Sequence, residues 1–237
     1  MLSVAFVAAA FAGHTYASPF TSVASTLDLV PRALSSGCST TGTQSCKNTT
    51  AVSNLCCFEA PGGLLLQTQF WDTDPSTGPS DSWTIHGLWP DRCDLTFDSS
   101  CDPARAYTGM SSILTANGAS DTLAYMQKYW VDINGQNEQF WERILMVQQS
   151  TLEVDCLPSG SARGAESLPT YTWLASAGIT PSSTATYTLA ALTSALKTAS
   201  GGFTPALDCQ SGSLNAISWY FNLKGSAIDG VFVPLSK

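Results

Sequence analysis

The eight residues Trp83-Thr84-Ile85-His86-Gly87-Leu88-Trp89-Pro90 decide how the rest of this 237-residue chain is interpreted. The stretch begins as a strand, and Pro90 is expected to end it near Leu88 because proline lacks the amide that a strand ladder needs. His86 lies between two tryptophans, where a base or sugar ring can stack beside a group that titrates near neutral pH. An isolated histidine is more often structural, so on the residues alone both roles remain open.

The elements expected around this stretch follow one another without regular alternation of strand and helix. They are a strand over 64–71, a turn-rich loop over 74–81, a helix over 122–130 capped by Asp121 or Ser120, a helix over 187–199, and strands over 218–223 and 231–234. This order predicts an α+β fold.

Composition and charge exclude several classes of protein. Hydrophobic residues make up 44% of the chain and charged residues 12%, which excludes a disordered acidic chain and a coiled coil. The formal net charge is −8 and the pI is near 4.5. This charge argues against passive binding of RNA or DNA, but it is compatible with an enzyme that works near its pI.

The N-terminal segment predicts a secretory route. Residues 2–12 are almost entirely apolar, and we place a signal-peptide cleavage site after Ala17. The alternative is a buried helix of the mature fold. The run is too short for a transmembrane helix, so the mature protein is expected to be extracellular or vacuolar and not membrane-bound. After cleavage, His86 is the only histidine left.

Eight cysteines agree with this route, because an even number in a secreted protein indicates a disulfide framework. Their spacing matches no zinc site, and no metal or other cofactor is expected. Asn48-Thr49-Thr50 is a glycosylation sequon at Asn48. We expect three regions: a signal peptide over 1–17, a Ser- and Thr-rich lead-in over 18–37, and one domain over 38–237.

The sequence 83–90 resembles the first active-site box of the ribonuclease T2 family, without a break over eight residues. The resemblance is to the fungal secreted branch, and it continues through 64–71, 140–142, 171–179 and 206–209. It implies the fold of that family, a central antiparallel sheet flanked by helices and stapled by disulfides. It also implies a secreted, monomeric, metal-free enzyme that cleaves RNA and not DNA, by attack of the ribose 2′-hydroxyl to give a 2′,3′-cyclic phosphate.

The resemblance also implies roles for single residues. His86 matches the first-box histidine, which we assign as the proton donor to the leaving group, and Glu142 is carried over as catalytic from the second box. The residues that the resemblance places around the bound bases are Trp89, Asp91, Phe97, Gln69 and Phe140. Phe97 stands where many relatives have tyrosine. For Gln69 and Phe140 the alternatives are a polar group within the strand and a core ring.

The second active-site box departs from the family pattern, Phe-Trp-Glu-His-Glu-Trp-x-Lys-His-Gly-Thr-Cys. It starts with Phe140-Trp141-Glu142 and then reads Arg143-Ile144-Leu145-Met146-Val147-Gln148-Gln149. The general base is therefore missing, and arginine cannot replace it. Since good matches flank the altered segment, we hypothesise a splicing or frame error in the gene from which the sequence was derived.

The family's disulfide pairing gives Cys38–Cys57, Cys46–Cys93 and Cys56–Cys156. Cys101 and Cys209 are left without partners, because their partners would lie in the second box and beyond Lys237. Each missing bridge would cost about 2–5 kcal/mol of stability.

Three hypotheses follow. The first is an acid ribonuclease, impaired as written. The second is a catalytically dead, secreted, RNA-binding relative. The third is a non-enzymatic defence or effector protein, which only the secretion signal and the cysteines favour. Other hydrolases fit poorly, because the chain has no Gly-x-Ser-x-Gly elbow and no phosphate loop.

Overall fold

The computed structural model describes residues 39–47, 63–71, 76–97, 107–148, 168–225 and 230–236. The predicted signal peptide, the lead-in, the sequon at Asn48 and the cysteine positions 38, 56, 57, 101 and 156 lie outside these residues. The elements are, in chain order, β1 (Leu64–Phe70), β2 (Thr84–Asp91), α1 (Met110–Ala116), α2 (Ser120–Tyr129), α3 (Asn137–Gln148), α5 (Thr170–Ser176), α6 (Leu189–Ala199), β3 (Ala206–Gln210), β4 (Ser213–Lys224) and β5 (Val231–Leu235).

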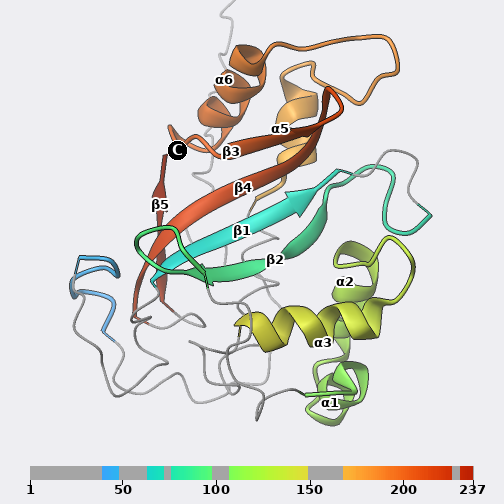
Figure 1. Ribbon diagram of the computed structural model, residues 1–237, viewed down its shortest axis with the longest axis vertical. Helices are drawn as coiled ribbons and strands as arrows, with labels where there is room; N and C mark the ends of the chain where they lie inside the picture. Colours follow the sequence, from blue (N-terminus) through green and yellow to red (C-terminus); the bar gives the residue numbers. More distant parts are fainter. Residues whose placement is uncertain are drawn as a thin grey trace, which may run out of the picture.

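A five-stranded antiparallel sheet forms the centre of the fold, in the order β2-β1-β4-β3, with β5 also paired to β4. Strand β4 is long enough for β3 to pair with its first half and β5 with its second. Helices α5 and α6 lie beside β3 and β4, α2 and α3 lie on the side of β2, and α1 packs against α2 and α3 (Figure 1). The predicted α+β architecture, a sheet flanked by helices, is confirmed.

Strand β2 contains a bulge at His86. Thr68 of β1 pairs with Gly87 and the next residue, Gln69, pairs with Ile85, so His86 is an extra residue with no counterpart on β1. In a regular strand, positions 86 and 89 would point to opposite faces of the sheet. The extra residue shifts this alternation by one, and His86 and Trp89 come to lie on the same face.

The sheet has a core face and a site face, which differ in burial. The core face carries Leu65, Gln67, Gln69, Ile85, Leu88, Ile217, Trp219 and Phe221. The site face carries Leu66, Phe70, His86, Trp89 and Tyr220. On the core face Trp219 and Phe221 are 1% and 4% exposed, whereas Leu66 and Tyr220 on the site face are only half-buried.

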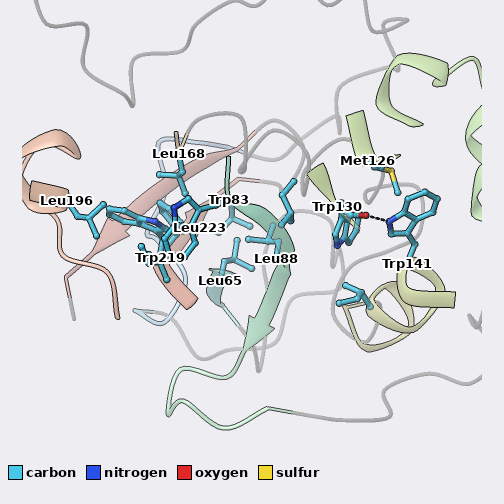
Figure 2. Close-up of a cluster of buried hydrophobic side chains, with 14 of the residues drawn as sticks. Leu65, Trp83, Leu88, Met126, Trp130, Trp141, Leu168, Leu196, Trp219 and Leu223 are labelled. Carbon is cyan, nitrogen blue, oxygen red and sulfur yellow. Dashed lines mark hydrogen bonds between the residues drawn. The ribbon is translucent and has the colours of Figure 1, made fainter. Parts of the chain in front are cut away.

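The hydrophobic core has two parts (Figure 2). In one part, Leu65, Trp219 and Leu223 of the sheet pack with Leu168 and Leu196, and the Trp173 ring of α5 meets Trp219 edge-on at 5.7 Å. The other part lies beside β2 and holds Met126, Trp130 and Trp141. Leu88 belongs to the same cluster and lies between the two parts. His86 therefore lies on a strand that is supported from both sides.

Several boundaries differ from the sequence predictions. The largest difference is in β4, which begins at Ser213, five residues before the strand predicted over 218–223, because its first half pairs with β3. Strand β2 continues through Pro90 to Asp91, because β2 is an edge strand and the missing proline amide interrupts no ladder on its open side. Helix α2 begins with Ser120 inside it and Ala119 as the N-cap residue, so neither predicted residue caps it. Helix α6 begins at Leu189, two residues after the predicted start, because the Thr188 side chain accepts from the Ala191 amide.

The segment 39–47 fastens one end of the sheet. The predicted Cys46–Cys93 disulfide is present and joins this segment to the residues after β2. The neighbouring Ser45 exchanges backbone and side-chain hydrogen bonds with Leu223 of β4 at 2.7 Å, and its hydroxyl donates to the Gly63 carbonyl just before β1. Two consecutive residues thus hold the ends of three strands together.

No helix of the described residues has both the length and the apolar character needed to cross a bilayer.

Candidate active site

His86 lies in a box of aromatic rings on the site face. Its ring centre is 4.5 Å from that of Phe70 on β1, 5.1 Å from that of Trp89 on β2 and 6.1 Å from that of Phe140 on α3. The structure therefore brings three predicted site residues together: His86, Trp89 and Phe140. Phe70 was not predicted, although its position in the strand 64–71, one residue after Gln69, was available from the sequence.

A series of tryptophan N–H groups holds His86 from several sides. The indole N–H of Trp89 donates to Nδ1 of His86 at 3.2 Å. The Trp130 indole donates to the His86 carbonyl at 3.0 Å, and the Trp141 indole donates to the Trp130 carbonyl at 2.6 Å (Figure 2). Because Nδ1 accepts a hydrogen bond, the neutral ring carries its proton on Nε2.

Burial sets the charge of His86. Removal from water lowers the pKa of His86 from its ordinary value of 6.5 to about 4. The imidazole is therefore neutral at neutral pH and gains its second proton only in acid. A bound phosphate would raise this pKa, because a nearby negative charge favours the protonated ring.

Helix α3 carries the start of the second box. The first three residues of that box, 140–142, make structural contacts. The Phe140 ring faces His86, and Trp141 is 2% exposed. A carboxylate oxygen of Glu142 accepts from the Gly109 amide at 2.8 Å, at the N-cap of α1, and Glu138 one turn earlier binds the amide and hydroxyl of Ser111. The catalytic role of Glu142 stays a prediction, and its carboxylate binds the start of α1.

The next two residues of the box contain no group that could exchange a proton with His86. Arg143 is exposed, and Ile144 is 4% exposed and belongs to the core. These are the positions at which the family pattern has histidine and glutamate. At this point the helix therefore contributes packing instead of proton-transfer groups.

The other predicted base-binding residues differ in position. Asp91 and Phe97 lie at and beyond the end of β2; Asp91 is 9% exposed and Phe97 is 70% exposed. Gln69 lies on the core face, away from His86. Its amide nitrogen donates to the Leu168 carbonyl at 3.0 Å and its amide oxygen accepts from the Thr170 hydroxyl. In that strand Phe70 is the residue beside His86.

A pocket of about 230 Å³ opens elsewhere, on the core face of the sheet. Its lining includes Asp81, Ile85, Tyr125, Tyr129 and Tyr171, and does not include His86. Among the described residues, no group of three or more His, Cys, Asp or Glu side chains is arranged to hold a metal ion. Cys209 is a free, exposed thiol in the structure.

Comparison with known proteins gives three kinds of match. The Ribonuclease T2 family model matches residues 62–144 and 161–229. Ribonuclease Le2 from Lentinula edodes is 53% identical over 221 residues, covering 86% of this chain and 91% of that protein. Ribonuclease T2 from Aspergillus oryzae is 43% identical over 206 residues, covering 81% and 75%.

Solved structures agree in fold. The crystal structure of Actibind, described as a T2 ribonuclease, has a TM-score of 0.77 and 42% identity, covering 84% of this chain and 91% of that one. The structure of RNase NT in complex with 5′-AMP is 18% identical with a TM-score of 0.57, and it covers 74% of this chain and 97% of that one.

Proposed function

Since the chain belongs to the ribonuclease T2 family, we propose that it is built to cleave RNA at His86, by attack of the ribose 2′-hydroxyl on the adjacent phosphorus. The products are a 2′,3′-cyclic phosphate and a free 5′-hydroxyl. The observation that carries the proposal is the placement of His86, which the bulge turns onto the site face among Phe70, Trp89 and Phe140. Flat aromatic surfaces next to a titratable ring suit a substrate made of bases and phosphates.

His86 acts as the proton donor in this proposal. The reaction needs one group that takes the 2′ proton and one that gives a proton to the leaving 5′ oxygen. In the neutral ring Nδ1 of His86 accepts from the Trp89 indole, so Nε2 is the atom available to the substrate. The second proton, gained in acid, goes to Nδ1 and replaces this hydrogen bond. The pKa of about 4 means that the donor form is populated in acid, and a phosphate bound beside the ring extends that range upward.

Acid also makes the approach of RNA easier. The formal net charge of −8 at pH 7 repels a polyanion, and this charge largely disappears near the pI of about 4.5. The same pH range therefore protonates His86 and removes the repulsion. We propose an acidic working range for both reasons.

Trp89 and Phe97 are proposed to stack on the base, with Asp91 as a hydrogen-bond acceptor beside them. Phe97 suits this role because it is 70% exposed at the end of a short loop. The Arg92 amide donates to the Thr96 carbonyl and the Leu95 amide to the Arg92 carbonyl. The amide and hydroxyl of Thr96 both donate to the Asp94 carboxylate, and together these bonds hold that loop. Phe140 is proposed to contact the neighbouring base.

RNA cleavage by this sequence is proposed to be impaired. Loss of one acid-base partner costs about 10²–10⁴ in rate. Here the general base and its neighbours are absent from the sequence after Glu142, and Ile144 packs in the core. The second candidate function, an inactive RNA-binding relative, is favoured by this same observation.

One experiment separates the two functions. The purified protein and its His86→Ala variant are incubated with RNA between pH 4 and 6, and cyclic phosphate ends are measured together with RNA binding. Cleavage that requires His86 supports a functional enzyme, whereas binding without cleavage supports the inactive relative. Absence of both would contradict the proposal.

We also propose an extracellular location, with RNA as the partner and a monomeric state. The support is the apolar N-terminal segment and the Cys46–Cys93 disulfide, since such bonds persist in oxidising compartments.

A further inference from the structure

Tyr220 lies across the site face from Trp89. In the sheet, Leu66 of β1 pairs with Trp89 on one side and with Tyr220 of β4 on the other. Cross-strand partners point to the same face, so the three side chains form one row. Leu66 and Tyr220 are both half-buried, which leaves part of this row accessible from outside.

The spacing of the row suits a flat ligand. Strands β2 and β4 are two strand spacings apart, about 9.5 Å. Two aromatic side chains that rise from those strands therefore stand on either side of Leu66, with an apolar floor between them. A planar ring that stacks on Trp89 would face Tyr220 across this gap.

The polar surroundings of Tyr220 also point toward a ligand. Burial and, second, the negative charge of Asp91 raise the pKa of the Tyr220 phenol. Asp91 pairs with Leu64 of β1, which pairs with Asn222 of β4, so Asp91 lies on the same face as Tyr220, in the next row of the sheet. A tyrosine that only filled space would instead be expected at a fully buried position, as its neighbours Trp219 and Phe221 on the core face are.

From this row we infer that Tyr220 is a further base-contacting residue, whose ring forms the wall opposite Trp89 and contacts the nucleobase of the bound RNA. The inference deepens the proposed function and rests on it. The ligand recognised at this point is a nucleobase, not the phosphate or ribose alone.

The test uses binding, because binding does not depend on the altered second box. The probes are 5′-AMP and, as a ligand without a base, ribose 5-phosphate, titrated at pH 5 with calorimetric detection. The variants are Tyr220→Leu, Tyr220→Phe and Trp89→Ala. Tyr187→Leu is the control, since Tyr187 is an exposed tyrosine before α6.

We expect Tyr220→Leu to weaken 5′-AMP binding about tenfold, as loss of one aromatic contact with a base does. It should leave ribose 5-phosphate binding within twofold, and Tyr220→Phe and Tyr187→Leu should bind both probes like the parent. Equal losses for both probes would show a structural role and overturn the inference. An equal tenfold loss in Tyr220→Phe would overturn it too, because that variant keeps the ring.

The outcomes separate this inference from the proposed function. If Trp89→Ala weakens 5′-AMP binding and Tyr220→Leu does not, the role of Tyr220 fails and the proposed site stands. If the parent protein does not bind 5′-AMP, or if Trp89→Ala has no effect, the proposed site fails and the inference fails with it.

Discussion

The strand that carries His86 and the helix that carries Phe140 correspond to the two active-site boxes, and they differ in what they retain. Strand β2 keeps both its supporting contacts and its reactive group, with the His86 ring bonded to Trp89 and its carbonyl bonded to Trp130. Helix α3 keeps its supporting contacts, through Trp141 and Glu142, and then continues with Arg143 and Ile144.

The contacts that support the site and the proposed reactive groups are therefore carried by different residues. Phe140, Trp141 and Glu142 face His86, Trp130 and α1, and they hold α3 against the rest of the fold. Ile144 extends the core without disturbing these contacts. The proposed impairment would therefore leave the packing of α3 against the fold unchanged.

The largest effect should come from restoring the reactive half of the second box. Changing Arg143→His, Ile144→Glu, Val147→Lys and Gln148→His together supplies the groups of the family pattern, and we expect RNA cleavage at pH 5 to rise by at least about 100-fold. Release of cyclic phosphate is the measurement. Adding His86→Ala to the four changes should remove the gain. If the unmodified chain already cleaves RNA as fast as the restored chain, the proposed difference between the two boxes is wrong.

The next largest effect is the loss of folding stability in acid that results from His86 in the first box. His86 has a pKa of about 4 in the folded chain and recovers its ordinary value of 6.5 on unfolding. Between these pH values the unfolded chain binds a proton that the folded chain does not, so the free energy of unfolding falls as the pH drops through this window. The loss from this group is about 3 kcal/mol.

The variant His86→Phe keeps a ring in the aromatic box but cannot titrate, so it should lose stability less steeply than the parent between pH 6.5 and 4. Urea denaturation of both proteins at pH 7, 5.5 and 4 measures the difference. Parallel pH profiles would show that the surroundings do not suppress protonation of His86.

A smaller effect is expected at the contact that links the two boxes. Trp141→Phe preserves most of the buried ring but removes the donor to the Trp130 carbonyl, and we expect a loss of about 1–3 kcal/mol in unfolding free energy. Trp173→Phe is a suitable control, since Trp173 also packs on the core. If both variants lose the same unfolding free energy, the smaller ring and not the missing hydrogen bond causes the loss.

The smallest effect should come from Glu142. Replacement by alanine removes the acceptor for the Gly109 amide and should cost about 1 kcal/mol, while Glu142→Gln keeps an acceptor oxygen and should cost less. Thermal unfolding of the two variants measures both values. In the restored chain, a rate loss above 100-fold in Glu142→Gln without loss of stability would instead support the predicted catalytic role.

Parts of the fold with a clear local pattern could be predicted from the sequence. Strand β1, helix α6 and strand β5 follow from runs of apolar residues with turn residues at their ends. The boundary error in β2 arises from tertiary context, because Pro90 is tolerated at the edge of the sheet. The error in α2 is local, because Ala119 is the N-cap residue and makes no side-chain cap hydrogen bond.

The site itself was only partly predictable. The aromatic setting of His86 was evident in the sequence, and the disulfide from Cys46 to Cys93 followed from the family pairing. The sequence did not show which face of β1 His86 shares, because this depends on the bulge in β2. One residue of shift decides whether Gln69 or Phe70 is the neighbour, and no local signal specifies that shift.

The fastening at Ser45 and Cys46 has a consequence for the order in which the sheet opens. It secures the end where Leu64, Asp91 and Asn222 meet, while His86 lies toward the opposite end, near Phe70 and Thr84. Mild reduction of the disulfide should therefore accelerate amide hydrogen exchange first around residues 63–65 and 222–224, and leave the amides around His86 protected. The surroundings of His86 would then outlast the covalent bond that helps hold the protein together.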